Sequence, residues 1–125
     1  MSERNESRLL RAHPDACLSP SQLEALADKL VAERQALAVE LERLHAEITR
    51  KEDCSVRDAA EAASLKEQVT RASGIAEQHR AVLAEIDSAL QRLASGSYGV
   101  SDVSGEPVPF DRLASIPWAR SRADE

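Results

Sequence analysis

Aromatic residues are nearly absent from this chain of 125 residues: Tyr98, Phe110 and Trp118 are the only three. Aromatic side chains usually supply much of the buried area of a large packed core. The sequence is instead rich in Ala, Leu, Glu and Arg, a composition typical of long helices. It therefore disfavours an all-β sandwich or barrel, and it disfavours the large packed core of an enzyme.

Cysteine, basic charge and long apolar runs are also scarce. Cys17 and Cys54 form no C-x-x-C pair, so we predict two free thiols. The net charge of −6 leaves no basic surplus for direct binding to nucleic acid. No apolar run approaches the ~20 residues that span a bilayer, and no signal-peptide core is seen near Met1. The sequence thus predicts a cytoplasmic protein that does not contact membranes.

The first helix has a strong start signal. Residues 1–17 lack periodicity, and we predict a flexible tail there. Ser19 is then placed at the N-cap, Pro20 at the first helical position, and Gln22 at the capping-box position. Apolar residues continue at helical spacing and predict a helix ending near Lys51.

A second apolar stripe alternates steps of four and three residues, the spacing of a coiled-coil seam. Its members are Leu65, Val69, Ala72, Ala76, His79, Leu83, Ile86, Leu90 and Leu93. Two narrow stripes joined by a short polar loop predict an antiparallel two-helix coiled-coil hairpin over residues 18–95, with its tip at about residues 52–57. Each arm would be roughly 45–55 Å long at about 1.5 Å per residue.

The remaining residues, 96–125, differ in character. Gly96 is a helix stop signal. Two short extended pieces, 98–100 and 108–110, flank a turn sequence and predict a short β-hairpin. Asp111 is expected to cap one last helical turn before Pro117. A segment this short usually needs a metal, disulfides or docking to be stable.

Three stretches of this sequence resemble the DksA/TraR family. They are Ile86–Val100 (IDSALQRLASGSYGV), Ser104–Val108 (SGEPV) and Arg112–Pro117 (RLASIP). In that family a helix ends in I-x-x-A-L-x-R-I-x-x-G-x-Y-G, and a four-cysteine zinc module with C-G-E-P-I and R-L-x-x-x-P follows. The resemblance covers residues 18–125. It implies a mainly α fold: the coiled-coil hairpin plus a small C-terminal module like a zinc finger.

The chain departs from the family at the zinc ligands. The four ligand positions are occupied by Ser101, Ser104, Arg122 and Glu125. Of these, Glu125 alone is a credible ligand, and zinc needs four. We therefore predict a degenerate, zinc-free module without a cofactor. Serine hydrogen bonds, an ion pair from Arg122 and apolar packing are expected to replace the metal, the packing coming from Val100, Val103, Val108, Phe110, Leu113, Ile116 and Trp118.

The resemblance implies a regulator of transcription that binds bacterial RNA polymerase and not DNA. In the family the hairpin enters the secondary channel, and acidic residues at its tip approach the catalytic centre. The tip motif Asp-x-x-Asp-x-Ala corresponds here to Asp58, Glu61 and Ala63, with Glu61 in place of the second aspartate. Asp58 and Glu61 equally form a helix-start signature, an N-cap with its capping-box partner, and the two roles can coexist.

Family members that respond to ppGpp, the effector of the stringent response, use basic side chains where the second helix meets the module. Here that stretch carries Glu85 and Asp87, with Arg112 and Ile116 expected opposite. Two acids repel a multiply charged phosphate, so we predict weak or absent cooperation with ppGpp.

Two other function classes are compatible with a helical hairpin to different degrees. An enzyme is disfavoured because the sequence shows no nucleophile–base pair and no phosphate loop. The alternative is a helical-hairpin adaptor that has lost polymerase regulation. The changed tip and the lost zinc ligands favour such divergence.

Overall fold

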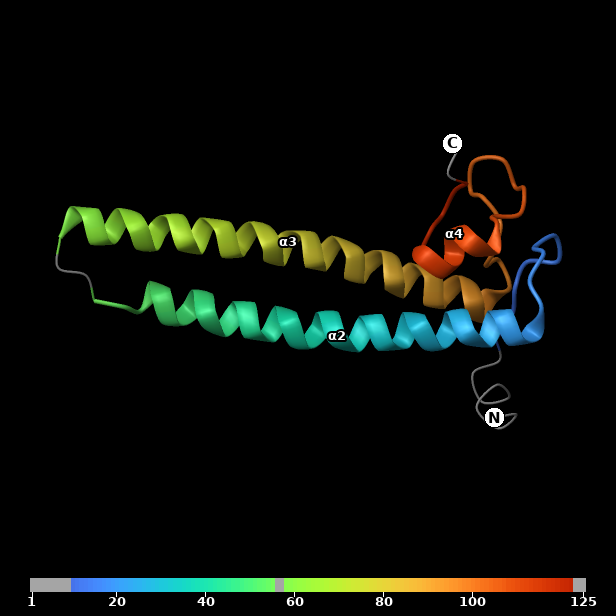
Figure 1. Cartoon of the computed structure of the whole chain (residues 1–125), viewed down its shortest axis with the longest axis horizontal. Helices are drawn as coiled ribbons and strands as arrows, with labels where there is room; N and C mark the ends of the chain where they lie inside the picture. Colours follow the sequence, from blue (N-terminus) through green and yellow to red (C-terminus); the bar gives the residue numbers. More distant parts are fainter. Residues whose placement is uncertain (1–9, 56–57, 123–125) are drawn as a thin grey trace. The chain divides into compact units, whose positions relative to one another are not determined.

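The computed structural model describes residues 10–55 and 58–122. Three helices appear in this part of the chain: α2 (Pro20–Glu52), α3 (Ala59–Ser95) and the short α4 (Phe110–Ser115) (Figure 1). The prediction of a mainly helical fold with two long helices is confirmed. Across the described ranges, no helix combines the length and hydrophobicity needed to cross a membrane.

The ends of the two long helices follow from local chemistry. The Ser19 hydroxyl accepts the Gln22 N–H at 3.2 Å, and the Gln22 side chain accepts the Ser19 N–H at 3.0 Å. This is the predicted capping box, which satisfies two backbone donors that the first turn leaves free. At the far end of α3, Gly96 adopts a φ of 84°, and the N–H groups of Gly96 and Ser97 both donate to the Arg92 carbonyl. The predicted glycine stop is therefore present.

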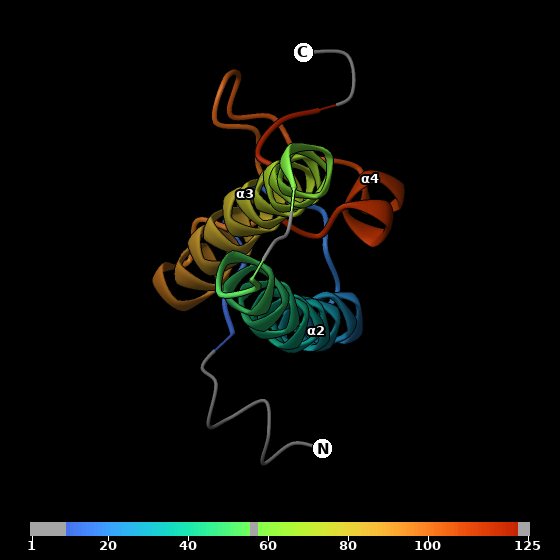
Figure 2. The same ribbon diagram turned by 90° about the vertical axis from the view of Figure 1, so that its left-hand side faces the viewer.

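The chain divides into two compact units. Gln35–Leu83 forms one, and the described residues before and after it form the other. Within Gln35–Leu83, the segments of α2 and α3 run antiparallel, and the end of α2 and the start of α3 face the viewer in Figure 2. Leu44, Ala72 and Ala76 are its buried core. Alanine supplies two of these three positions, so the helices of this unit are held by little apolar volume.

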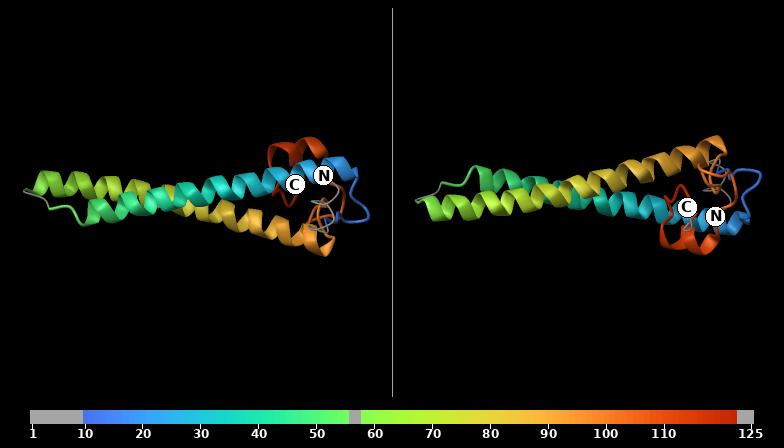
Figure 3. Two further views of the ribbon diagram at one scale, coloured as in Figure 1. Left: turned by 90° about the horizontal axis from the view of Figure 1, so that it is seen from below. Right: turned by 90° about the horizontal axis from the view of Figure 1, so that it is seen from above.

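The other unit has the larger core. Its largest fully buried side chains come from α2, α3, α4 and the segments beside them: Leu26, Leu30, Ile86, Leu93, Tyr98, Leu113 and Pro117. The helix α4 lies beside the first part of α2 (Figure 3), and the Lys29 ammonium donates to the Ala114 carbonyl at the end of α4. Packing of α4 against α2 thus ties the C-terminal segment to the start of the first long helix.

Part of the predicted tail is attached to this unit. The Arg11 N–H donates to the Leu93 carbonyl at 2.8 Å, and the His13 N–H donates to the Tyr98 carbonyl at 2.7 Å. Gly99, with a φ of 98°, lies so close to this segment that a Cβ there would come within 2.7 Å of Ala16. Residues 11–16 therefore pack along the chain that leaves α3, and Gly99 permits the approach.

The β-hairpin predicted from residues 98–100 and 108–110 is shorter in the structure than we expected. The described chain shows there a single isolated antiparallel bridge between Val100 and Pro107, with hydrogen bonds from Ser101 to Glu106 and from Val108 to Gly99. Prolines at 107 and 109 have no N–H to donate, so a longer ladder cannot form.

The expected cap of the last helix is also wrong. Helix α4 begins at Phe110, one residue before Asp111, and Pro109 holds the N-cap position without a side-chain hydrogen bond. Asp111 lies in the first turn, where its charge still suits the positive end of the helix.

Candidate functional site

The predicted site lies at the end of the Gln35–Leu83 unit where α2 ends and α3 begins. The predicted tip, residues 52–57, leads directly into the first turns of α3, and from here on we call residues 52–63 together the tip. The last turn of α2 closes with hydrogen bonds from Asp53 to the Thr49 carbonyl at 3.0 Å and from Cys54 to the Lys51 carbonyl at 3.2 Å. Residues 56 and 57 lie outside the described chain. The described side chains of the tip are all exposed.

Asp58 is held by the start of α3. Its carboxylate oxygen accepts the Glu61 N–H at 2.8 Å, which makes Asp58 the N-cap of the helix. The structural half of the prediction is therefore confirmed for Asp58. The hydrogen bond also orients the carboxylate, because one oxygen is engaged by the backbone while the other stays directed at solvent or a partner.

The tip is mainly acidic. Glu52, Asp53, Asp58 and Glu61 are exposed carboxylates within ten residues of sequence. Lys51, which immediately precedes the tip in the sequence, donates to Glu47 of its own helix at 3.0 Å. Carboxylates at this density can bind a basic loop or contact a metal-associated group of a partner.

Ala63 lies one turn into α3 and is exposed, as are Glu61 and the alanines around it. Asp58 thus precedes α3 as its N-cap, and Glu61 and Ala63 lie in the first two turns of the helix.

Two of the four positions that hold zinc ligands in the family form a hydrogen-bonded turn. The buried Ser101 hydroxyl accepts the N–H groups of Val103 at 3.1 Å and Ser104 at 3.3 Å. The Ser104 hydroxyl accepts the Glu106 N–H at 3.4 Å. The serine oxygens are therefore used to satisfy the backbone of the turn.

The third position, Arg122, forms an ion pair with Glu106, as the sequence led us to expect. Glu125 lies outside the described residues. Zinc does not fit this donor set, because two hydroxyls already hold backbone donors and a guanidinium repels a cation. Within residues 10–55 and 58–122, no group of three or more His, Cys, Asp or Glu side chains is placed to hold a metal.

The apolar packing expected to replace zinc is present in part. Val108 and Leu113 are buried, whereas Val100, Phe110, Ile116 and Trp118 are half-buried. Val103 is 72% exposed, so its expected place in the core is wrong. It sits in the turn closed by Ser101, and that turn directs its side chain outward.

The acids expected to repel ppGpp are each paired with an arginine. Arg120 donates to Glu85 at 2.5 Å, and Arg34 donates to Asp87 at 2.6 Å. Between them Ile86 is fully buried, so this stretch of α3 presents two exposed ion pairs on either side of an apolar anchor. Both acids were expected at these positions of the second helix, but no pattern in the sequence indicated either arginine partner.

A bond that sequence reasoning missed lies at the centre of the larger core. The Tyr98 hydroxyl, fully buried, donates to the Pro117 carbonyl at 2.6 Å. The Arg92 guanidinium lies 5.9 Å from the centre of the Tyr98 ring and donates to the Trp118 carbonyl at 3.4 Å. These contacts fasten the segment after α4 to the end of α3.

Comparison with known proteins gives several matches. No protein-family model matches the sequence. The RNA polymerase-binding transcription factor DksA of Caulobacter vibrioides is 30% identical over 106 residues, which cover 82% of this chain and 71% of that protein. General stress protein 16O of Bacillus subtilis is 39% identical over 46 residues, which cover 37% of this chain and 28% of that protein.

A solved structure matches as well. Transcription factor DksA2 from Pseudomonas aeruginosa superposes with a TM-score of 0.75 at 34% sequence identity, over 83% of this chain and 79% of that one. A match of this score over most of both chains is a likeness of fold.

Proposed function

The chain belongs to the DksA/TraR family, and we propose that it is a transcription regulator that binds RNA polymerase. The observation that carries this proposal is the 30% identity over 82% of the chain to a protein named as an RNA polymerase-binding transcription factor. The role is a binding one, without catalysis, exerted in the cytoplasm where the polymerase works.

The proposed mode of action is entry of the tip into the secondary channel of the polymerase. It is supported by the exposed carboxylates at the start of α3 and by the hydrogen bond that orients Asp58. The net charge of −6 speaks against contacts with DNA phosphates, so the regulator would act through the enzyme.

Glu61 is the position at which activity should differ from that of relatives with Asp-x-x-Asp-x-Ala. Its extra methylene moves the carboxylate by about 1 Å, and placement on this scale matters near a catalytic centre. At promoters where the two tip aspartates of relatives act, the regulatory effect of this chain should therefore differ in size from that of those relatives.

Cooperation with ppGpp should be weak. Arg120 and Arg34 are engaged by Glu85 and Asp87, so a phosphate would have to displace a carboxylate to reach either of them. The expected result is a polymerase affinity that changes little when ppGpp is added, and a large enhancement would contradict it.

The test of the proposed function begins with binding. The purified chain should co-purify with core RNA polymerase at micromolar concentration and compete with Gre-type channel factors. In a transcription assay, the Asp58→Ala/Glu61→Ala double variant should keep binding and lose most of the regulatory effect. Absence of binding at micromolar concentration would favour the adaptor role instead.

A further inference from the structure

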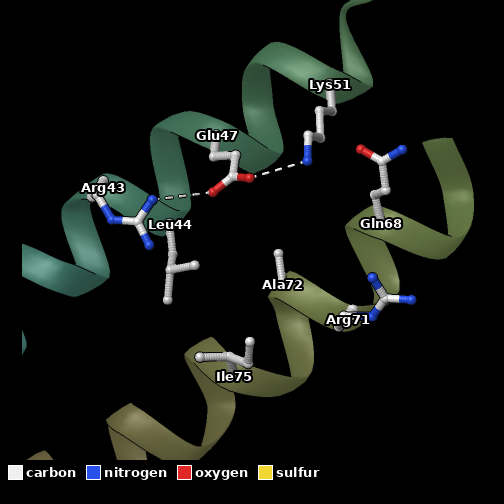
Figure 4. A pocket seen from close by; sticks show the side chains of 8 residues that line it. All are labelled: Arg43, Leu44, Glu47, Lys51, Gln68, Arg71, Ala72 and Ile75. Carbon is white, nitrogen blue, oxygen red and sulfur yellow. Dashed lines mark hydrogen bonds and ion pairs between the residues drawn. The ribbon is translucent and has the colours of Figure 1, made fainter.

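A hollow of about 500 Å³ opens between α2 and α3 within the Gln35–Leu83 unit (Figure 4). Its apolar floor is formed by Leu44, Ala72 and Ile75. The first two are buried, whereas the Ile75 side chain is 40% exposed, a high value for an isoleucine beside a core. The volume lies in the range of about 300–1,000 Å³ that is usual for binding sites.

The rim of the hollow is basic. Arg43, Lys51 and Arg71 line it with a single carboxylate, Glu47, in a chain whose net charge is −6. Glu47 accepts hydrogen bonds from Lys51 at 3.0 Å and from Arg43 at 3.4 Å. The bond from Lys51 lowers the pKa of the Glu47 carboxyl below its ordinary value, so this acid stays ionised and holds the two cations at the rim.

Arg71 is the rim cation most available to a partner. Its side chain is 69% exposed, and its contact with Glu67 is long, at 3.9 Å. Arg43 is more strongly engaged, because it also donates to Glu40 at 2.6 Å. Glu40 and Glu67 lie outside the lining of the hollow, so the surface that faces an incoming group is positive on balance.

The shape favours a protein segment over a small molecule. All lining side chains come from two helices, so the hollow covers one side of whatever enters it, whereas small-ligand sites usually bury most of the ligand. An apolar centre surrounded by a charged rim is instead the arrangement of an interface anchor.

We propose that the hollow receives an apolar side chain from an acidic segment of the polymerase, with carboxylates of that segment paired to Arg71 and Lys51. The inference rests on the proposed function, because it names the partner chemistry of a second surface on the same regulator. This surface would add a contact on the flank of the helices to the contact made by the tip.

Charge reversal on the rim tests the ionic half of the proposal. Arg71→Glu should weaken binding of the full chain to core RNA polymerase about tenfold, and the loss should shrink as salt is raised. Arg80→Glu is the matched control, because Arg80 is an exposed α3 arginine that pairs with Glu77 of the same helix and does not line the hollow. It should bind within about twofold of wild type.

Filling the hollow tests the apolar half. Gln68→Trp keeps every charge and places a ring in the space, so it should also weaken binding about tenfold while circular dichroism shows unchanged helicity. A photoreactive benzoylphenylalanine at Gln68 should crosslink to a polymerase peptide in which an apolar residue is flanked by Asp or Glu.

The outcomes separate this proposal from the proposed function. If wild type binds while Arg71→Glu and Gln68→Trp bind equally well, the hollow is not an interface and the function stands. A crosslink to a basic peptide, or none, overturns the inference in the same way. If wild type itself fails to bind polymerase, the proposed function fails and this contact fails with it.

Discussion

Tyr98 is the aromatic residue that is fully buried beside the C-terminal segment. Its ring is fully buried, whereas Phe110 and Trp118 are half-buried, so the three aromatics do not share the core equally. Its hydroxyl reaches the Pro117 carbonyl nineteen residues further along the chain. The short segment after α3 is thus closed by one side chain where the family uses a metal.

Removing that hydroxyl should be costly. Tyr98→Phe leaves the buried Pro117 carbonyl without its donor, and an unsatisfied buried acceptor costs about 1–3 kcal/mol. We expect the free energy of unfolding to fall by about that amount in urea denaturation followed by Trp118 fluorescence. Gln91→Ala, an exposed change on α3, should stay within about 0.5 kcal/mol of wild type. Equal stability of the two variants would show that the bond contributes nothing.

The buried Tyr98 hydroxyl also predicts that the free energy of unfolding falls at alkaline pH. Burial raises the pKa of Tyr98 well above its ordinary value, and the nearby Arg92 opposes this only in part. The neutral form is therefore favoured in the folded state, and the contribution of Tyr98 to stability is complete below the unfolded pKa of about 10 and falls as pH rises above it. Unfolding free energies measured from pH 8 to 11 should decline in wild type and decline less steeply in Tyr98→Phe. Parallel curves would contradict the assignment.

Helix boundaries were the best predicted elements because their causes are local. The Ser19–Gln22 capping box, the Asp58 cap and the Gly96 stop each involve residues within a few positions of one another. The β-hairpin failed because Pro107 and Pro109 remove donors that the pattern of valines concealed. On α3, Ala89 is fully buried while its neighbour Leu90 is half-buried, since the small residue permits close packing that periodicity does not reveal.

Two substitutions separate the role of Asp58 as the N-cap of α3 from its proposed role as a charged group that acts on the polymerase. Asn caps helices about as well as Asp, so Asp58→Asn should keep the stability of α3 within a few tenths of a kcal/mol while removing the charge. Asp58→Ala removes both and should cost about 1 kcal/mol. If the carboxylate acts on the polymerase, both variants should lose regulation in a transcription assay. Full regulatory activity of Asp58→Asn would show that Asp58 serves only as the N-cap of α3.

Contacts between distant parts of the sequence lay beyond sequence reasoning. Arg11 with Leu93, Lys29 with Ala114, and Arg120 with Glu85 join segments whose approach depends on the complete fold. The basic rim around Arg71 was missed for the same reason, because its cations come from both long helices. The tip residues Asp58, Glu61 and Ala63 could be proposed from the sequence because they lie within six positions of one another and resemble a family motif.

The contacts of the C-terminal segment determine whether the folded chain needs a metal ion for its stability. The ligand positions now hold a serine turn and the Arg122–Glu106 ion pair, and Tyr98 closes the segment from within. We therefore expect elemental analysis of the purified chain to find far less than one zinc per chain, because the described donors cannot complete a tetrahedral site. Thermal unfolding should be unchanged by EDTA, since no metal-binding free energy contributes to folding. A four-cysteine relative treated in parallel should lose its zinc and unfold at lower temperature. Stoichiometric zinc in this chain, or a lower unfolding temperature in EDTA, would show that Glu125 and other donors build a site after all.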